Sequence, residues 1–152
     1  MLRYNYEDIN TLSVYGGKNF NNGTAFRTDL TPMIGFSAGL FNGVSLALNA
    51  DAEWKGLYIS TQSQYSLPVK SNSAAFYYNW TELGFYVTEF FFTGITIQST
   101  RTKEKMETEP GFAAGLDFKW FSIPVYFFKP LTAEPYLIVG VNMGFDLKRK
   151  IN

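Results

Sequence analysis

Large apolar residues recur at every second position through much of this chain. The clearest case runs from Val44 to Trp54, where the even-numbered positions are Val, Leu, Leu, Ala, Ala and Trp and most of the odd-numbered ones are polar. A two-residue period is typical of a β-strand with one apolar face, and about 11 residues is the length of a barrel strand that crosses a bilayer. A helical period would place Leu48 beside Asp51, so the pattern favours a strand.

The same alternation, with turn residues between the segments, predicts about eight strands, an even number of the kind found in bacterial outer-membrane barrels. We expect these strands near residues 9–16, 31–41, 44–65, 74–89, 91–102, 110–120, 122–129 and 134–147. Asn42-Gly43 is a strong hairpin signal. Lys55-Gly56 is ambiguous: it is either a bulge inside one long strand, which we favour, or a turn that adds a strand.

The connections and the aromatic residues support a barrel in a membrane. Tight turns alternate with longer polar links, as in outer-membrane barrels. Aromatic residues gather near both kinds of connection, which predicts two girdles at the membrane interfaces. The predicted tight-turn girdle contains Phe41, Phe90, Phe91, Trp120, Phe121 and Phe145, and the predicted long-link girdle contains Trp54, Tyr58, Tyr77, Tyr78, Trp80 and Tyr136.

The two phases of the alternation predict which side chains face outward and which face the lumen. One phase is large and apolar, and the other consists mainly of Gly, Ser, Ala and Asn, which suit the narrow interior of a small barrel. We expect the following residues to face lipid or a partner: Leu46, Leu48, Trp54, Phe112, Leu116, Phe118, Trp120, Val139, Val141 and Phe145. We expect a polar network in the lumen from Asp51, Glu53, Glu82, Asp117 and Lys119.

Composition narrows the possible functions. Charged residues make up 17% of the chain, and 13 basic residues balance 13 acidic ones, so nothing indicates a nucleic-acid-binding protein. The chain has no Cys and no His, which excludes disulfides, thiolate metal sites and a histidine general base. No apolar stretch is long enough for a membrane helix, so a membrane-spanning form would have to be a closed barrel. The sequence predicts neither a catalytic site nor a metal or cofactor.

Glycine or aromatic residues recur at alternate positions in four segments, residues 32–41, 78–83, 111–116 and 137–145. These segments resemble a family of small outer-membrane β-barrel domains that is common in Bacteroidota. The resemblance implies a single barrel domain over residues 1–152 in the cell outer membrane of a Gram-negative bacterium. It brings no catalytic motif. Such barrels usually end on an aromatic residue that the assembly machinery recognises, and the matching residue is Phe145, although Asp146 to Asn152 follow it here.

Together these observations predict an all-β, antiparallel up-and-down transmembrane β-barrel of about eight strands that is not an enzyme. Its expected role is structural, or that of an accessory subunit of a larger outer-membrane complex for secretion, nutrient uptake or barrel assembly. The expected contacts are membrane lipid, lipopolysaccharide and a larger outer-membrane protein, with no cofactor and no nucleic acid. The alternative is a soluble, lipocalin-like barrel whose apolar phase faces inward around a small hydrophobic ligand.

Overall fold

The computed structural model describes residues 1–4, 7, 9–69, 73–118 and 120–143, and these form β-strands without a helix. The strands are β1 (Leu2–Tyr4), β2 (Leu12–Gly17), β3 (Phe20–Asn22), β4 (Phe26–Ala38), β5 (Gly43–Trp54), β6 (Leu57–Pro68), β7 (Phe76–Tyr86), β8 (Phe91–Arg101), β9 (Met106–Asp117), β10 (Phe121–Phe128), β11 (Tyr136–Val139) and β12 (Asn142–Met143). In this part of the chain no helix is long and apolar enough to cross a membrane.

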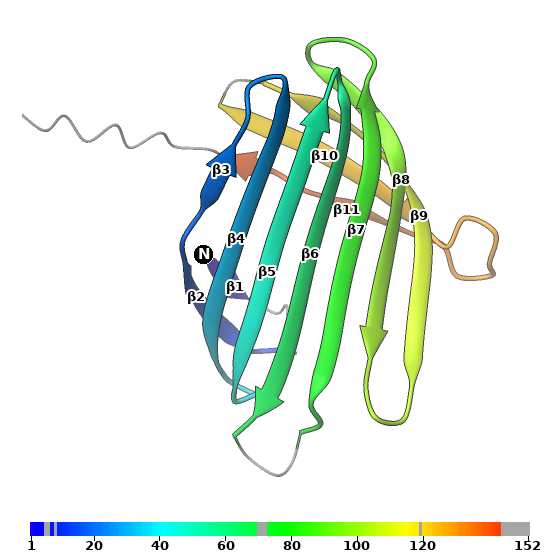
Figure 1. Ribbon diagram of the computed structural model, residues 1–152. Coiled ribbons are helices and arrows are strands. Elements are labelled where there is room, and N and C mark those ends of the chain that lie inside the picture. Colours follow the sequence, from blue (N-terminus) through cyan, green and yellow to red (C-terminus); the bar gives the residue numbers. More distant parts are fainter. Residues whose placement is uncertain (5–6, 8, 70–72, 119, 144–152) are drawn as a thin grey trace, which may run out of the picture.

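All strands belong to one antiparallel sheet, and from β4 to β11 each strand pairs with the next one along the chain. Its order is β1-β2-β4-β5-β6-β7-β8-β9-β10-β11, with β3 continuing beside β4 and β12 beside β10. Figure 1 shows the long strands β4 to β9 side by side, with β10 and β11 crossing behind them. The predicted all-β, up-and-down antiparallel architecture is therefore confirmed, whereas the predicted number of about eight strands is too low, since this order contains ten in the part of the chain that the structure describes.

The predicted closure of this sheet into a barrel is not present. Among the described residues, β1 at one edge pairs with β2, and β11 and β12 at the other edge pair with β10, but no pairing joins the two edges. Both edges are built from short strands, three residues in β1, four in β11 and two in β12. Gly140 and Val141 separate β11 from β12, so that edge offers no continuous ladder.

The segment predicted as one long strand over residues 44–65 is a hairpin, so the predicted bulge is wrong. Strands β5 and β6 pair along their full length, with Trp54 opposite Leu57, and Lys55-Gly56 is the turn between them. Both turn residues have positive φ, 50° at Lys55 and 83° at Gly56. That combination is the one a two-residue type I′ turn requires, because its handedness matches the twist of the strands.

This hairpin also changes the ends at which the aromatic residues lie. The connection at residues 39–42 lies at the same end as residues 69–75, 102–105 and 129–135, so Phe41 belongs with the long links. Trp54 and Tyr58 flank the tight turn at the other end. Tyr58 donates a hydrogen bond to the buried Glu82 and Trp80 packs against Tyr126, so both lie on the inner face, and the predicted long-link girdle is not formed.

Candidate functional site

The outer face of the sheet is covered by exposed apolar side chains. On β4 and β5 the exposed positions include Phe36, which is 65% exposed, and Leu46, which is 59% exposed. The alternate positions on the same strands, such as Ser37 and Ser45, are buried against the inner face. On β4 and β5 the strand period therefore places large apolar residues on the outside and mostly small residues, several of them polar, on the inside, whereas a soluble sheet buries its apolar face.

The residues predicted to face lipid or a partner all lie among the exposed large apolar residues wherever they are described. These are Leu46, Leu48, Trp54, Phe112, Leu116, Phe118, Trp120, Val139 and Val141, and Phe145 lies outside the described residues. They come from β5, β9, the β9–β10 turn, β11 and the residue before β12, so they extend across the width of the sheet.

Four glycines on the inner face lie directly opposite aromatic residues on the neighbouring strand. The pairs are Tyr15 with Gly35, Tyr58 with Gly84, Phe92 with Gly115, and Phe128 with Gly111. A Cβ atom at Gly35 would lie 2.3 Å from the Tyr15 ring, and one at Gly84 would lie 2.3 Å from the Tyr58 ring. Each glycine therefore makes room for an aromatic ring that lies flat across the strands.

Two predicted lumen residues, Glu82 and Asp117, are bound by tyrosine hydroxyls. Glu82 is 6% exposed and accepts a hydrogen bond from Tyr58 on the neighbouring strand β6, and Tyr126 reaches it across the interior from β10. Tyr86 donates to Asp117 with an O–O distance of 2.7 Å. Hydrogen bonds of this kind satisfy a buried carboxylate through neutral donors.

Of the remaining predicted lumen residues, Glu53 interacts electrostatically with Tyr86, the tyrosine that also interacts with Glu82 and Asp117. Asp51 is exposed and lies opposite Asp29 on β4. Glu53 forms an ion pair with Arg27 at an N–O distance of 3.7 Å, and both side chains are well exposed. Lys119 lies outside the described residues. The structure thus brings Glu53, Glu82 and Asp117 around Tyr86, whereas Asp51 lies exposed near the β5–β6 turn.

Sequence analysis missed a polar cluster that joins the N-terminal segment to β6. Arg3 donates to Oε1 of Gln64 at 3.0 Å, and Gln64, only 1% exposed, donates to Glu7 at 3.3 Å. Glu7 also accepts hydrogen bonds from Tyr15, at 2.6 Å, and from Ser13. Because β1 and β6 lie four strands apart in the sheet, these contacts require it to be strongly curled around a filled interior.

A small polar island interrupts the apolar outer face on β6 and β7. It consists of Thr61, Ser63, Asn79 and Thr81, which are hydrogen-bonded to one another at 2.9–3.2 Å. Its members occupy the strand phase of Ile59 and Leu83, both of which are exposed. The island therefore satisfies its own polar groups within an apolar surround.

The β10–β11 connection is tied to β9 by an ionic contact near the long-link end. Lys129 Nζ lies 3.0 Å from Oε1 of Glu109, whose other oxygen accepts a hydrogen bond from Tyr136 at 2.6 Å. The hydrogen bond to Glu109 raises the pKa of Lys129. The described residues contain no group of three or more acidic side chains that could hold a metal ion.

No family model, curated protein or solved structure matches this chain. The resemblance to the outer-membrane β-barrel domain family therefore stays a prediction, and function is argued below from the two faces of the sheet.

Proposed function

We propose that this protein is a non-enzymatic β-barrel of a bacterial outer membrane, with lipid around its outer face. The supporting observation is the inversion of polarity between the two faces. Ile34, Leu46 and Phe112 are more than half exposed outside, whereas Ser45, Gln64 and Glu82 are buried inside. Apolar surface of this extent is unfavourable in water and favourable in hydrocarbon.

In the membrane, the sheet closes by pairing β1 with β11 and β12. An open edge in hydrocarbon leaves backbone N–H and C=O groups without partners, at several kcal/mol each. The path from β1 to β11 contains ten strands, each antiparallel to the next, so its first and last strands run in opposite directions. Direct pairing of these edges therefore gives an all-antiparallel barrel with an even number of strands, as in single-chain bacterial barrels.

The filled interior supports a structural or accessory role in a larger outer-membrane complex over a role as a general pore. The interior holds the N-terminal cluster around Gln64 and a group of packed aromatic rings, in which Trp80 meets Phe128 edge-on and Phe128 stacks on Tyr136. The filled interior also disfavours the lipocalin-like alternative, because a hydrophobic ligand requires an open apolar cavity and here aromatic and polar side chains pack against one another. The chain's lack of His and Cys supports a non-enzymatic role.

Membrane insertion is tested by comparing the refolded protein in water and in phosphatidylcholine vesicles. We expect the protein to float with the vesicles, to resist extraction by carbonate, and to become protected from protease. A protein that is monodisperse and folded without any amphiphile would contradict the proposal, whatever its strand pairing.

Closure is tested separately by disulfide cross-linking, since the natural chain has no cysteine. Leu2→Cys is combined with Leu137→Cys, Val139→Cys or Val141→Cys, all at exposed outer positions. Directly opposed residues on paired strands lie within disulfide range, so one combination should cross-link within a single chain. Leu2→Cys with Phe85→Cys, on β7, is the control that should not. Cross-links only between chains, or none, would contradict direct closure.

A further inference from the structure

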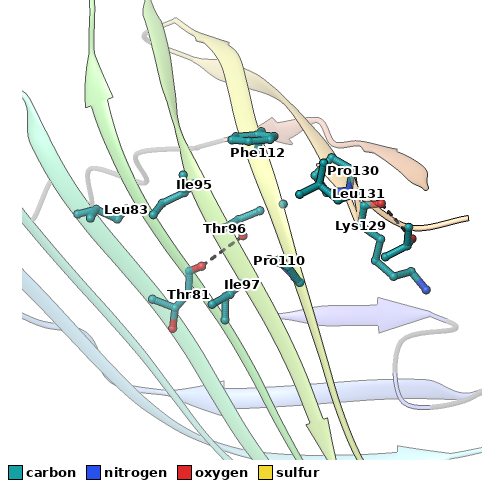
Figure 2. A pocket seen from close by; sticks show the side chains of 12 residues that line it. Thr81, Leu83, Ile95, Thr96, Ile97, Pro110, Phe112, Lys129, Pro130 and Leu131 are labelled. Carbon is teal, nitrogen blue, oxygen red and sulfur yellow. Dashed lines mark hydrogen bonds between the residues drawn. The ribbon is translucent and has the colours of Figure 1, made fainter. Parts of the chain in front are cut away.

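An apolar groove lies on the outer face where the β10–β11 connection overhangs β8 and β9. Its volume is about 590 Å³. Figure 2 shows Leu83, Ile95 and Ile97 along the floor, Phe112 and Pro110 beside them, and Pro130 and Leu131 forming the wall. Leu131 is 98% exposed, so this leucine projects from the wall with almost no protein contact of its own.

The wall of the groove is fixed to its floor. The backbone N–H of Lys129 donates to the carbonyl of Pro110 at 2.9 Å, and the Lys129 side chain pairs with Glu109. Thr132 closes the connection through its N–H and its hydroxyl, which donate to the carbonyl of Lys129 at 3.1 and 3.0 Å. The groove is therefore a built concavity and does not depend on a loosely held loop.

The polar side chains that line the groove already have partners within the protein. Thr96 donates to the carbonyl of Thr81 at 3.2 Å, and the Thr81 hydroxyl is bonded within the polar island. Pro110 and Pro130 have no N–H to offer. Among these lining residues nothing is arranged to recognise a polar ligand, so the contacts that the groove offers are apolar.

The position of the groove indicates what fills it. Ile97 and Pro110 are opposed in the interior of β8 and β9, away from the strand ends, and the groove is continuous with the apolar outer face. We propose that it binds one acyl chain of a membrane lipid, which lies along the outer faces of β7 to β9 beneath Pro130 and Leu131. This inference rests on the proposed membrane location, because it requires the groove to face hydrocarbon.

Native mass spectrometry tests the inference on protein refolded in dodecyl maltoside with palmitoyl-oleoyl phosphatidylethanolamine. The natural chain should retain one lipid, and Ile97→Trp, which fills the groove, should reduce that retention about ten-fold. Ile95→Trp fills the same groove from a neighbouring position and serves if Ile97→Trp does not fold. Ile34→Trp, at an exposed outer position on β4, is the matched control and should retain the lipid.

The remaining outcomes separate this inference from the proposed function. Equal retention by Ile97→Trp and Ile34→Trp, or no retention by a natural chain that inserts into vesicles, would overturn the groove while leaving the membrane location intact. Palmitoyl-oleoyl phosphatidylglycerol should bind equally well, and dependence on the headgroup would overturn acyl-chain recognition. A protein adduct in place of the lipid, lost in Ile97→Trp, would assign the groove to a partner chain. A chain that needs no amphiphile would refute the proposed function itself.

Discussion

Along β4 and β5 the two faces of one pair of strands are stabilised in different ways. The inner face holds Ser37, Ser45 and Ala47 in fixed contacts, including a hydrogen bond from Ser13 to Ser37. The outer face presents Ile34 and Leu46 without protein contacts that would cover them. The inner face therefore depends on specific packing, and the outer face depends on the surrounding medium. A substitution that disturbs the inner face should lower stability equally in detergent and in vesicles. The loss of stability caused by a substitution on the outer face should instead depend on which amphiphile surrounds it.

The largest effect is expected from a charge on the outer face. Leu48→Arg should cost about 2–4 kcal/mol of unfolding free energy in a bilayer, because it places a guanidinium in hydrocarbon near the middle of β5. In dodecyl maltoside the loss should be smaller, since detergent and water rearrange around the charge. Urea unfolding in both media measures the difference. Asp51→Arg, on the other phase of β5, is the control. If Leu48→Arg lowered the unfolding free energy equally in both media, the outer face would not differ from the inner face in its dependence on the medium.

A methyl group on the inner face should have the next largest effect. Gly84→Ala places a Cβ 2.3 Å from the Tyr58 ring, and overpacking of this kind costs about 1–3 kcal/mol. Gly16→Ala is the matched control, because no heavy atom lies within 4 Å of the added Cβ. The loss for Gly84→Ala should be the same in vesicles and in detergent. Normal stability of this variant would show that the ring moves aside freely.

The alternation of the sequence was enough to predict the strands and their two faces, because period and polarity are local. The β5–β6 turn could also have been predicted from the sequence. A single strand over 22 residues would extend roughly 70 Å, more than twice the hydrocarbon thickness of a bilayer. The apolar positions change from even numbers up to Trp54 to odd numbers from Leu57, and either a bulge or a turn can produce this change. The length of the segment is what favours a turn at Lys55-Gly56.

The inner contacts were beyond sequence analysis for a physical reason. Glu7 and Gln64 are 57 positions apart, and no local pattern brings them together before the sheet curls. The glycine–aromatic pairs left a partial signal, because Gly35 and Gly84 stand in the inward phase opposite strands that carry tyrosines. Identifying the partner of each glycine requires the register between strands, which the corrected hairpin alters for every strand after it.

A smaller loss is expected when one hydrogen bond is removed without changing the packing. Tyr58→Phe keeps the ring over Gly84 but removes a hydroxyl that donates to the buried Glu82. Leaving a buried carboxylate short of a donor costs about 1–2 kcal/mol. Tyr77→Phe, whose hydroxyl donates to Ser63 on the outer face, is the control and should cost less. Thermal unfolding should show the same loss of stability for Tyr58→Phe in detergent and in vesicles. A loss seen only in vesicles would contradict this, because the contribution of the Tyr58 hydroxyl would then depend on the surrounding medium.

The smallest effect should come from removing the polar island altogether. The fourfold variant T61V/S63A/N79L/T81V replaces every side-chain donor and acceptor of this outer cluster at once, so no member is left without its partner, and outside the cluster the exposed Tyr77 hydroxyl loses its acceptor Ser63. Such a replacement is close to neutral, within roughly 0.5 kcal/mol, because the hydrogen bonds removed were balanced against one another. Asn79→Leu alone should cost about 1 kcal/mol, since it deprives Thr61, Ser63 and Thr81 of a shared partner. Removing Glu82 and its tyrosine hydroxyls together should not be neutral, because their packing also fills the interior. A fourfold variant that unfolds as readily as Tyr58→Phe would show that the outer face carries specific contacts too, and the contrast between the faces would then fail at β6 and β7.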